Sequence, residues 1–265
     1  YSVTIQSELD DQDSGTKYGL GSSGAVTVAT VEAILLYYGY ELDPLLVFKL
    51  SVLTQARLNM TGSHGDLAAS SFRGLVAYYS LDKSWLSEQM SVQGLSNLLA
   101  SDWKDLQIKQ IGLPAPLELL VGWTGSAAST THLVSHMESK KTQQSKEEIY
   151  SQFLNDSKVC VEQLIWACQN KDIPCIKQAV TRNRYLLRKF SEDMSLTIET
   201  PLLTELCDSA EANGAVAKSS GAGGGDCGIC LVDSQEQKEN IQIIWEQAGI
   251  FPLPLTIAER NKERI

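Results

Sequence analysis

A glycine-rich run that leads directly into an apolar segment constrains this 265-residue chain more than any other feature. The run is Gly19-Leu20-Gly21-Ser22-Ser23-Gly24, and the apolar segment after it covers residues 25–36. The start of a helix has free backbone N–H groups and a partial positive charge. Glycines before such a start and hydroxyl groups on it suit a bound phosphate. We interpret this junction as a cradle for the phosphates of a nucleotide.

Composition excludes several classes of protein. The chain carries 22 Lys and Arg against 32 Asp and Glu, a net charge of −10, whereas nucleic-acid binding depends on clustered positive charge. No apolar run approaches the roughly 20 residues of a membrane span, and the first residues show no secretory pattern. We therefore expect a cytoplasmic protein. Six cysteines, five of them in apolar segments, are typical of reduced thiols in a core.

Apolar periodicity and turn residues predict mixed helices and strands. The predicted helices cover residues 22–38, 44–59 and 66–72, a long segment after a capping box of Ser145 and Glu148, and segments that begin at Asp172, Thr200 and Glu236. The predicted strands cover residues 1–9, 75–79, 106–111, 117–123, 215–218, 227–232 and 252–257. The absence of regular strand–helix alternation favours the α+β class.

Two of these predictions concern tertiary structure. Residues 22–38 are apolar on nearly every face of the predicted helix, so we expect that helix to be central and buried. The strands at 106–111 and 117–123 flank Gly112-Leu113-Pro114, which predicts a hairpin.

The glycine run also matches the G-x-G-x-x-G pattern of dinucleotide-binding oxidoreductases. Asp43 follows Gly24 by 43 − 24 = 19 residues, about where a ribose-binding acid would lie. That pattern requires an apolar strand before the first glycine, whereas residues 10–18 are polar. Asp43 also precedes Pro44 at a predicted helix start, where N-capping explains it. The dinucleotide interpretation is therefore the weaker one.

Ser22 and Ser23 leave two roles open. Their hydroxyl groups can cap the helix, or they can bind a phosphate oxygen or Mg²⁺, an ion that prefers oxygen ligands. Neither the G-x-x-x-x-G-K-[ST] loop nor the protein-kinase H-R-D motif occurs in the chain. Any phosphotransferase built on this sequence belongs to neither of those classes.

Two motifs in a fixed order resemble the GHMP kinases, the superfamily of galactokinase, homoserine kinase, mevalonate kinase and phosphomevalonate kinase. Residues 17–25, KYGLGSSGA, resemble its second motif, and residues 220–228, SGAGGGDCG, resemble its third, 221 − 21 = 200 residues further on. Residues 218–220 with Asp226, and the loop 62–70, are similar to the bacterial phosphomevalonate kinase branch. The resemblance extends over the whole chain.

The resemblance implies a two-domain α+β fold. Residues 1–115 would form an N-terminal, ATP-binding domain like domain 2 of ribosomal protein S5, and residues 116–265 a ferredoxin-like C-terminal domain. The family's first motif, an N-terminal strand with a Lys near the transferred phosphate, is absent, and Tyr1 opens directly into a strand-like alternation. We therefore expect a chain that lacks its natural start and is inactive without it.

The branch implies ATP-dependent phosphorylation of (R)-5-phosphomevalonate to the 5-diphosphate, in isoprenoid synthesis. ATP would lie over the amides of Gly19 to Gly24, with Mg²⁺ on Ser22 or Ser23, and Ala222, Gly223 and Gly224 would complete the site. Phosphoryl transfer depends mainly on positioning and charge neutralisation, which such parts supply. The alternatives are another GHMP kinase acting on an alcohol, such as mevalonate kinase, or a non-catalytic relative that binds ligands.

Asp66 occupies the family's catalytic-acid position, although it could instead N-cap the short helix after Gly65. A phosphate monoester has its second pKa near ~6 and is mostly dianionic at pH 7, so with such an acceptor Asp66 would orient groups rather than remove a proton. The resemblance implies a catalytic role for Lys17 as well. It places further residues beside the acceptor: Lys17, Ser63, His64, Ser126, Ser129 and Ala222. A basic run around Arg182 and Arg184 is either a solvated helix face or a source of contacts to the acceptor phosphate.

Two remaining pairs invite metal or redox chemistry. His132 and His136 are four residues apart on a predicted helix but have no evident third ligand, so we expect ordinary surface residues. Cys227 and Cys230 are three apart in a predicted strand, which places them on opposite faces. We expect no nucleic-acid or membrane partner, and a monomer or homodimer.

Overall fold

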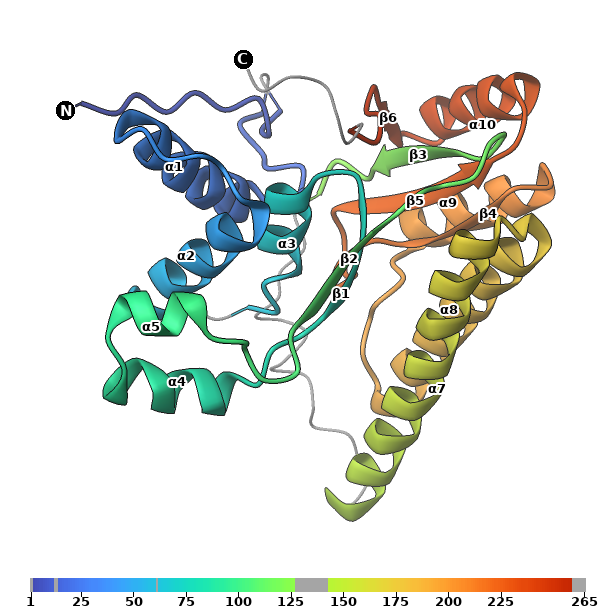
Figure 1. Ribbon diagram of the computed structural model, residues 1–265. Coiled ribbons are helices and arrows are strands. Elements are labelled where there is room, and N and C mark those ends of the chain that lie inside the picture. The colour runs from blue at the N-terminus through green and yellow to red at the C-terminus, as the bar shows by residue number, and fades with distance from the viewer. Residues whose placement is uncertain (1, 12–13, 61, 127–142, 259–265) are drawn as a thin grey trace. The chain divides into compact units, whose positions relative to one another are not determined.

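The computed structural model describes residues 2–11, 14–60, 62–126 and 143–258 (Figure 1). The fold divides into two compact units. Unit 1 consists of residues 1–7, 21–112 and 257–265, and unit 2 of residues 8–20 and 113–256. The boundary predicted between an N-terminal domain that ends at residue 115 and a C-terminal domain that begins at residue 116 stays a prediction.

Unit 1 surrounds a two-stranded antiparallel sheet with helices. Its helices are α1 (Ser22–Tyr37), α2 (Pro44–Arg57), α3 (Gly65–Phe72), α4 (Lys83–Val92) and α5 (Leu95–Ala100), and its strands are β1 (Leu75–Tyr79) and β2 (Gln107–Ile111). Leu75 pairs with Ile111 and Tyr79 with Gln107. Side chains of α1, α2, α3 and α4 form one buried core around Phe48 and Leu67.

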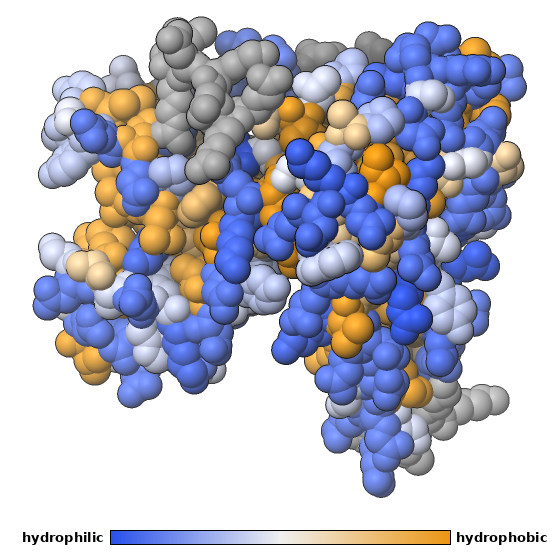
Figure 2. Space-filling model, turned by 45° about the vertical axis from the view of Figure 1, so that its right-hand side comes forward, coloured by the Kyte–Doolittle hydropathy of each residue, from blue (hydrophilic) through white to orange (hydrophobic). Residues whose placement is uncertain are grey.

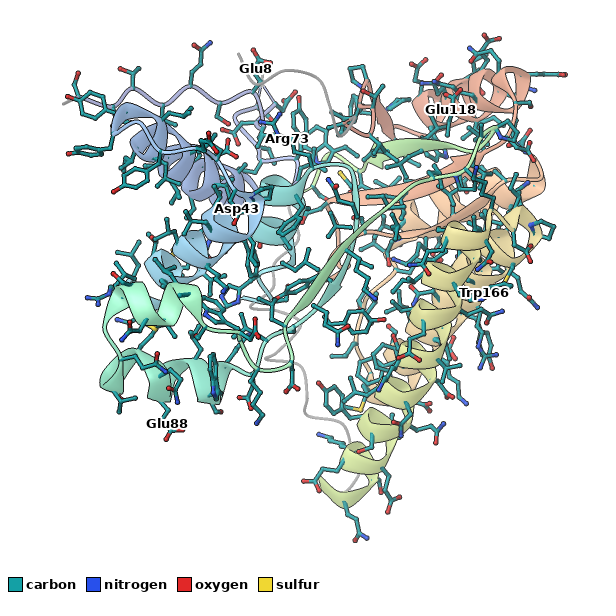
Figure 3. All side chains as sticks on the ribbon, viewed as in Figure 1. Glu8, Asp43, Arg73, Glu88, Glu118 and Trp166 are labelled. Carbon is teal, nitrogen blue, oxygen red and sulfur yellow. The ribbon has the colours of Figure 1, made fainter. Side chains whose placement is uncertain are left out.

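Helix caps explain where several helices begin. The Asp43 carboxylate accepts a hydrogen bond of 2.9 Å from the backbone N–H of Leu46, so this acid caps α2 as predicted (Figure 3). Asp82 caps α4 by accepting from the backbone N–H of Trp85 at 2.9 Å. Helices α4 and α5 were not expected from the sequence, because each is short and its apolar periodicity covers few turns.

Unit 2 contains a four-stranded antiparallel sheet in the order β4-β5-β3-β6. Its strands are β3 (Glu118–Trp123), β4 (Val216–Ser219), β5 (Cys227–Val232) and β6 (Phe251–Leu253), and its helices are α7 (Gln143–Asn170), α8 (Ile173–Met194), α9 (Pro201–Ala212) and α10 (Gln235–Gln247). Helices α9 and α10 cover one face of the sheet, where Leu206 and Trp245 are fully buried. On the other face, Val121, Trp123 and Cys227 pack with Tyr18 and Leu20.

The predicted hairpin is wrong. Strand β2 pairs with β1 in unit 1, whereas β3 pairs with β5 and β6 in unit 2. Four consecutive residues of β3, 120–123, are buried. A strand buried on both faces belongs in the interior of a sheet, so its neighbours come from distant parts of the chain.

The prediction that helix 22–38 is buried is also wrong. Only Gly24 and Val28 of α1 are buried, and Leu36 and Tyr37 are 54% and 68% exposed. Helix α1 packs on α2 and α3, which cover one side of it. Other hydrophobic residues also reach the surface on the face of the molecule that Figure 2 shows.

Three smaller predictions need correction. Residues 2–8 form no strand. Ser145 lies inside α7 rather than capping it. Strand β6 ends at Leu253, since only Phe251 to Leu253 pair with β3. Among the described helices, none is both long and apolar enough to cross a membrane.

Candidate functional site

The first turn of α1 has no side-chain cap. Its N-cap residue is Gly21, which adopts a left-handed conformation with φ 76° and ψ 36°. Such a conformation favours glycine because a side chain there is strained. Ser22 is the first helical residue, so neither Ser22 nor Ser23 caps the helix and the capping alternative is wrong. The hydroxyl groups and the helix start remain suited to an anionic ligand.

Asp66 lies against the glycines at this helix start, within unit 1. A Cβ atom on Gly24 would lie 2.3 Å from Asp66 Oδ2, and one on Gly21 would lie 3.1 Å from Asp66 Cβ. Glycine at position 24 is therefore what allows the carboxyl group to approach the first turn of α1. Two segments about 40 residues apart in sequence thus meet.

Asp66 does not N-cap α3. The N-cap residue is His64, with φ 62°, and Asp66 lies in the first helical turn. Its carboxylate is exposed and interacts favourably with the partial positive charge at the start of its own helix. The alternative role of Asp66 as the N-cap of this helix is therefore excluded.

The loop before Asp66 is held by side chains from two other elements. The Tyr78 hydroxyl, on β1, donates a 2.9 Å hydrogen bond to the Ser63 carbonyl. The Lys83 ammonium, at the start of α4, donates to the Gly62 carbonyl. Neither residue was singled out in the sequence, since a Tyr in a strand and a Lys at a helix start carry no pattern of their own. Together they fix the backbone that leads to Asp66.

His64 is the buried residue of this loop. Only 6% of its surface is exposed, and burial together with the nearby Lys83 ammonium lowers its pKa. Its neighbour Ser63 is exposed, and the Ser63 hydroxyl accepts a 3.3 Å hydrogen bond from the backbone N–H of Gly65. The two residues predicted to face the same acceptor thus differ sharply in accessibility.

In unit 2 the two glycine-rich motifs meet. A Cβ atom on Gly19 would lie only 2.2 Å from Asp226 Cγ, so glycine is required for this approach. Asp226 has a left-handed backbone with φ 52°, and its N–H donates to the Ser126 carbonyl at 2.8 Å. Its carbonyl accepts from the N–H and the hydroxyl of Thr124, each at 2.9 Å. The end of β3 therefore fixes the acid that ends the second glycine loop.

The second glycine loop joins β4 to β5. The Gly224 N–H donates a 2.7 Å hydrogen bond to the Ile198 carbonyl, and a Cβ on Gly223 would lie 2.5 Å from that oxygen. This close approach requires glycine at position 223, whereas at Gly221, where a Cβ would meet nothing within 4 Å, only the positive φ of 63° favours glycine. Lys218, just before the loop, has its pKa lowered by burial, and its ammonium donates to the Ser219 carbonyl.

Arg184 does not face an acceptor. It is 4% exposed, and its guanidinium binds the carboxylates of Glu199 at 2.7 Å, Asp208 at 2.5 Å and Glu211 at 2.9 Å. Burial alone would lower the pKa of Arg184, but the three carboxylates outweigh it and raise the pKa. The expectation that Arg184 reaches a phosphate is therefore contradicted, while Arg182 on the same helix is exposed.

The remaining predicted residues differ in their location. Lys17 and Ser126 are exposed, Lys17 in an isolated antiparallel bridge with Asp10. Ser129, His132 and His136 lie outside the described residues. Cys227 and Cys230 belong to different buried clusters, which confirms that they lie on opposite faces of β5.

Two family models match separate parts of the chain. The model described as "GHMP kinases N terminal domain" matches residues 1–74, and the model described as "GHMP kinases C terminal" matches residues 164–250. The chain is 39% identical over 258 residues to the phosphomevalonate kinase of Streptomyces sp. (strain CL190), covering 97% of this chain and 68% of that relative. It is 28% identical over 249 residues to the mevalonate kinase of Thermococcus sibiricus, covering 92% of this chain and 64% of that relative.

Solved structures agree with these similarities. The Lin0012 protein from Listeria innocua has a TM-score of 0.89 and 37% identity, over 96% of this chain and 70% of that one. Phosphomevalonate kinase from Streptococcus pneumoniae, in complex with phosphomevalonate and AMPPNP, has a TM-score of 0.78 and 34% identity, over 92% of this chain and 69% of that one. The α+β class and the two-domain kinase fold expected from the sequence are therefore confirmed.

Proposed function

This chain belongs to the GHMP kinase family, and on that premise we propose that it is a phosphomevalonate kinase. The reaction is transfer of the γ-phosphoryl group of ATP to the phosphate of (R)-5-phosphomevalonate, giving 5-diphosphomevalonate and ADP in isoprenoid synthesis. One observation carries the proposal: the uncapped, glycine-rich start of α1 with Asp66 lying against Gly24. It combines a phosphate-binding helix start with an acidic group at the same place.

We assign the ATP phosphates to the amides of Gly19 to Gly24, with Gly223 and Gly224 contributing from the second loop, and we assign Ala222 of that loop to the acceptor. Mg²⁺ would be held by the hydroxyl of Ser22 or Ser23, neither of which is used as a cap. Among the described residues no group of three His, Cys, Asp or Glu side chains could hold a metal ion. Mg²⁺ prefers oxygen ligands and keeps several waters, and in kinases it is bound in part by the phosphates of the substrate. Bound there, the ion would neutralise phosphate charge during transfer.

Asp66 is assigned to orienting the reacting groups, because the acceptor phosphate is already mostly dianionic at pH 7. The exposed side chains of Lys17, Ser63, Ser126 and Arg182 are assigned to binding the acceptor, together with Ser129. His64 is buried, so we place it behind the acceptor loop, supporting it rather than touching the acceptor.

Turnover with two acceptors tests the assignment. With ATP and Mg²⁺, protein that contains this chain should phosphorylate phosphomevalonate much faster than mevalonate. Equal turnover of the two compounds, or none with either, would exclude the proposal. Asp66→Asn should lower kcat at least about tenfold while leaving ATP affinity unchanged, because the substitution alters an orienting group and not the phosphate cradle. An unchanged kcat would return Asp66 to a structural role.

Location and assembly complete the proposal. We place the protein in the cytoplasm, with phosphomevalonate as its small-molecule partner, and expect a monomer or homodimer. Cell fractionation and light scattering in solution would test these two expectations.

A further inference from the structure

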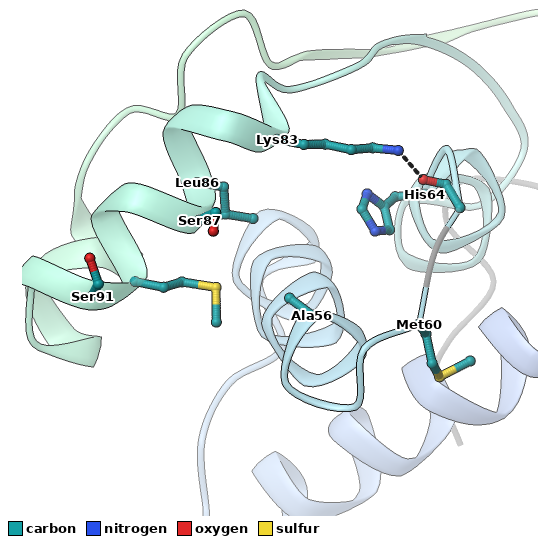
Figure 4. Close-up of a pocket in the computed structure, with 9 residues that line it drawn as sticks. Ala56, Met60, His64, Lys83, Leu86, Ser87 and Ser91 are labelled. Carbon is teal, nitrogen blue, oxygen red and sulfur yellow. Dashed lines mark hydrogen bonds between the residues drawn. The ribbon is translucent and has the colours of Figure 1, made fainter.

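Unit 1 contains a pocket of about 370 Å³ that the kinase assignment does not use (Figure 4). It lies between the end of α2, the loop before α3 and one side of α4. Its apolar wall is formed by Ala56, Met60, Leu86 and Met90, and its polar wall by Gly62, His64, Lys83, Ser87 and Ser91. The volume lies within the range of small-molecule sites, and such sites combine an apolar lining with a few polar groups.

The polar wall contains a buried nitrogen atom with no partner. His64 is only 6% exposed, and its Nδ1 atom is buried and makes no hydrogen bond within the described structure. Leaving a buried polar atom unpaired is costly, so such an atom calls for an explanation. Figure 4 shows the His64 ring on the side of its loop that faces α4. A ligand in the pocket would supply the missing partner.

Lys83 gives the pocket a positive charge. Its ammonium donates one hydrogen bond to the Gly62 carbonyl, and an ammonium group has three protons to donate. An anion adds to such a hydrogen bond the attraction between opposite charges, which a neutral carbonyl does not provide. An anionic group that entered the pocket would therefore attract Lys83 and compete with Gly62 for it.

We propose that this pocket binds a small organic anion, with a short aliphatic body against Met60, Leu86 and Met90 and a carboxylate or phosphate head on Lys83 and His64. This site is separate from the acceptor site. His64 is the N-cap residue of α3 and Asp66 lies in the first turn of that helix. A ligand in the pocket therefore lies next to the loop that carries the proposed orienting residue.

Binding can be followed by NMR through the imidazole of His64. The chain has three histidines, and the variant His64→Asn identifies which ring signal belongs to position 64. Hexanoate, hexyl phosphate and hexanol serve as probes with the same aliphatic body. We expect both anions to move the His64 signal and to bind about tenfold or more tightly than hexanol, because only the anions bring a negative charge to the Lys83 ammonium. The tighter of the two identifies the preferred head group.

Two variants make the test specific. Lys83→Met should abolish the preference for anions over hexanol. Lys104→Met is the matched control, because Lys104 is an exposed lysine paired with Asp82 at the start of the same helix, and it should leave the preference intact. Failure of all three probes to move the His64 signal at millimolar concentrations, or equal binding of hexanol, would overturn the proposal.

Competition distinguishes this pocket from the acceptor site. Added phosphomevalonate should leave the affinity of hexanoate within about twofold of its original value. If phosphomevalonate weakened hexanoate binding in proportion to its concentration, the anion would be bound at the acceptor site and the separate pocket would be excluded. This experiment does not require turnover, so its failure is distinguishable from failure of the kinase proposal.

Discussion

At the residue scale, Gly24 links the phosphate cradle to Asp66. Alanine in place of glycine inside a helix is favourable by about 1 kcal/mol in isolation. Here the added Cβ would lie 2.3 Å from Asp66 Oδ2. We therefore expect Gly24→Ala to lower kcat by about 100-fold by displacing Asp66, with little loss in the free energy of unfolding. Steady-state kinetics and urea unfolding of the same variant measure both quantities.

Gly94→Ala is the matched control. Gly94 precedes α5 with φ −69°, which alanine adopts freely, and an added Cβ there would meet no atom within 4 Å. This variant should leave kcat unchanged and lower the free energy of unfolding by no more than about 1 kcal/mol, because Gly94 is the N-cap residue of α5 and alanine is the poorer cap. A Gly24→Ala variant with normal turnover would show that Asp66 has room to move without consequence.

Also at the residue scale, His64 makes stability depend on pH. Burial, and then the nearby Lys83 ammonium, lower its pKa below the ordinary value of 6.5. Between the lowered pKa and 6.5 the unfolded chain binds a proton that the folded chain does not, so stability falls as pH falls through that window. His64→Asn should remove this part of the pH dependence, since asparagine tolerates the left-handed φ of 62°.

NMR titration checks the cause of the shift. The His64 ring should titrate below 6.5, and Lys83→Met should move its midpoint upward without restoring it fully, because burial remains. A midpoint at or above 6.5 in the unaltered protein would contradict this account.

At the element scale, α8 holds the segment behind the second glycine loop. Arg184 on α8 pairs with Glu199, and both side chains are at least 93% buried. The residue before Glu199, Ile198, accepts the hydrogen bond from the Gly224 N–H. We expect Arg184→Met to lower the free energy of unfolding by about 3–5 kcal/mol, because it leaves the Glu199 carboxylate buried without its partner.

Arg182→Met is the control for that variant. Arg182 is on the same helix and exposed, so its loss should change stability by no more than about 0.5 kcal/mol. Urea unfolding of the two variants gives the comparison. Equal effects at the two positions would contradict the view that burial and pairing determine the contribution of this helix.

Element boundaries were predictable where local chemistry fixes them. Asp43, Asp172 and Thr200 each cap a helix, as a short polar side chain before a proline-containing first turn indicates. The pairing of β3 was not predictable, because it depends on strands more than 100 residues further along the chain. The same holds for the approach of Asp66 to Gly24, since the sequence contains both motifs but not the contact between them.

At the scale of the whole molecule, all six cysteines belong to unit 2. Five are buried, and burial raises the pKa of Cys207, Cys227 and Cys230 to about 12. Cys175 is partly exposed. We expect iodoacetamide at pH 8 to modify Cys175 first in the folded protein, because the thiolate is the reactive form and the other thiols are both protonated and covered.

Mass spectrometry of partly alkylated protein locates the modified thiols. The five buried cysteines should react only when unit 2 unfolds, so their labelling reports on unit 2 alone. Rapid modification of Cys207 or Cys230 under native conditions would contradict the buried core between the sheet and α9.

The division of the chain between the two units also affects the order in which they can form. The polypeptide passes from one unit to the other at residues 7/8, 20/21, 112/113 and 256/257. Domains usually fold one after another as a chain is synthesised, the N-terminal one first. Here the segments of the two units alternate along the sequence, and the last segment of unit 2 ends at residue 256. Unit 2 can therefore finish folding only after the ribosome has passed that residue.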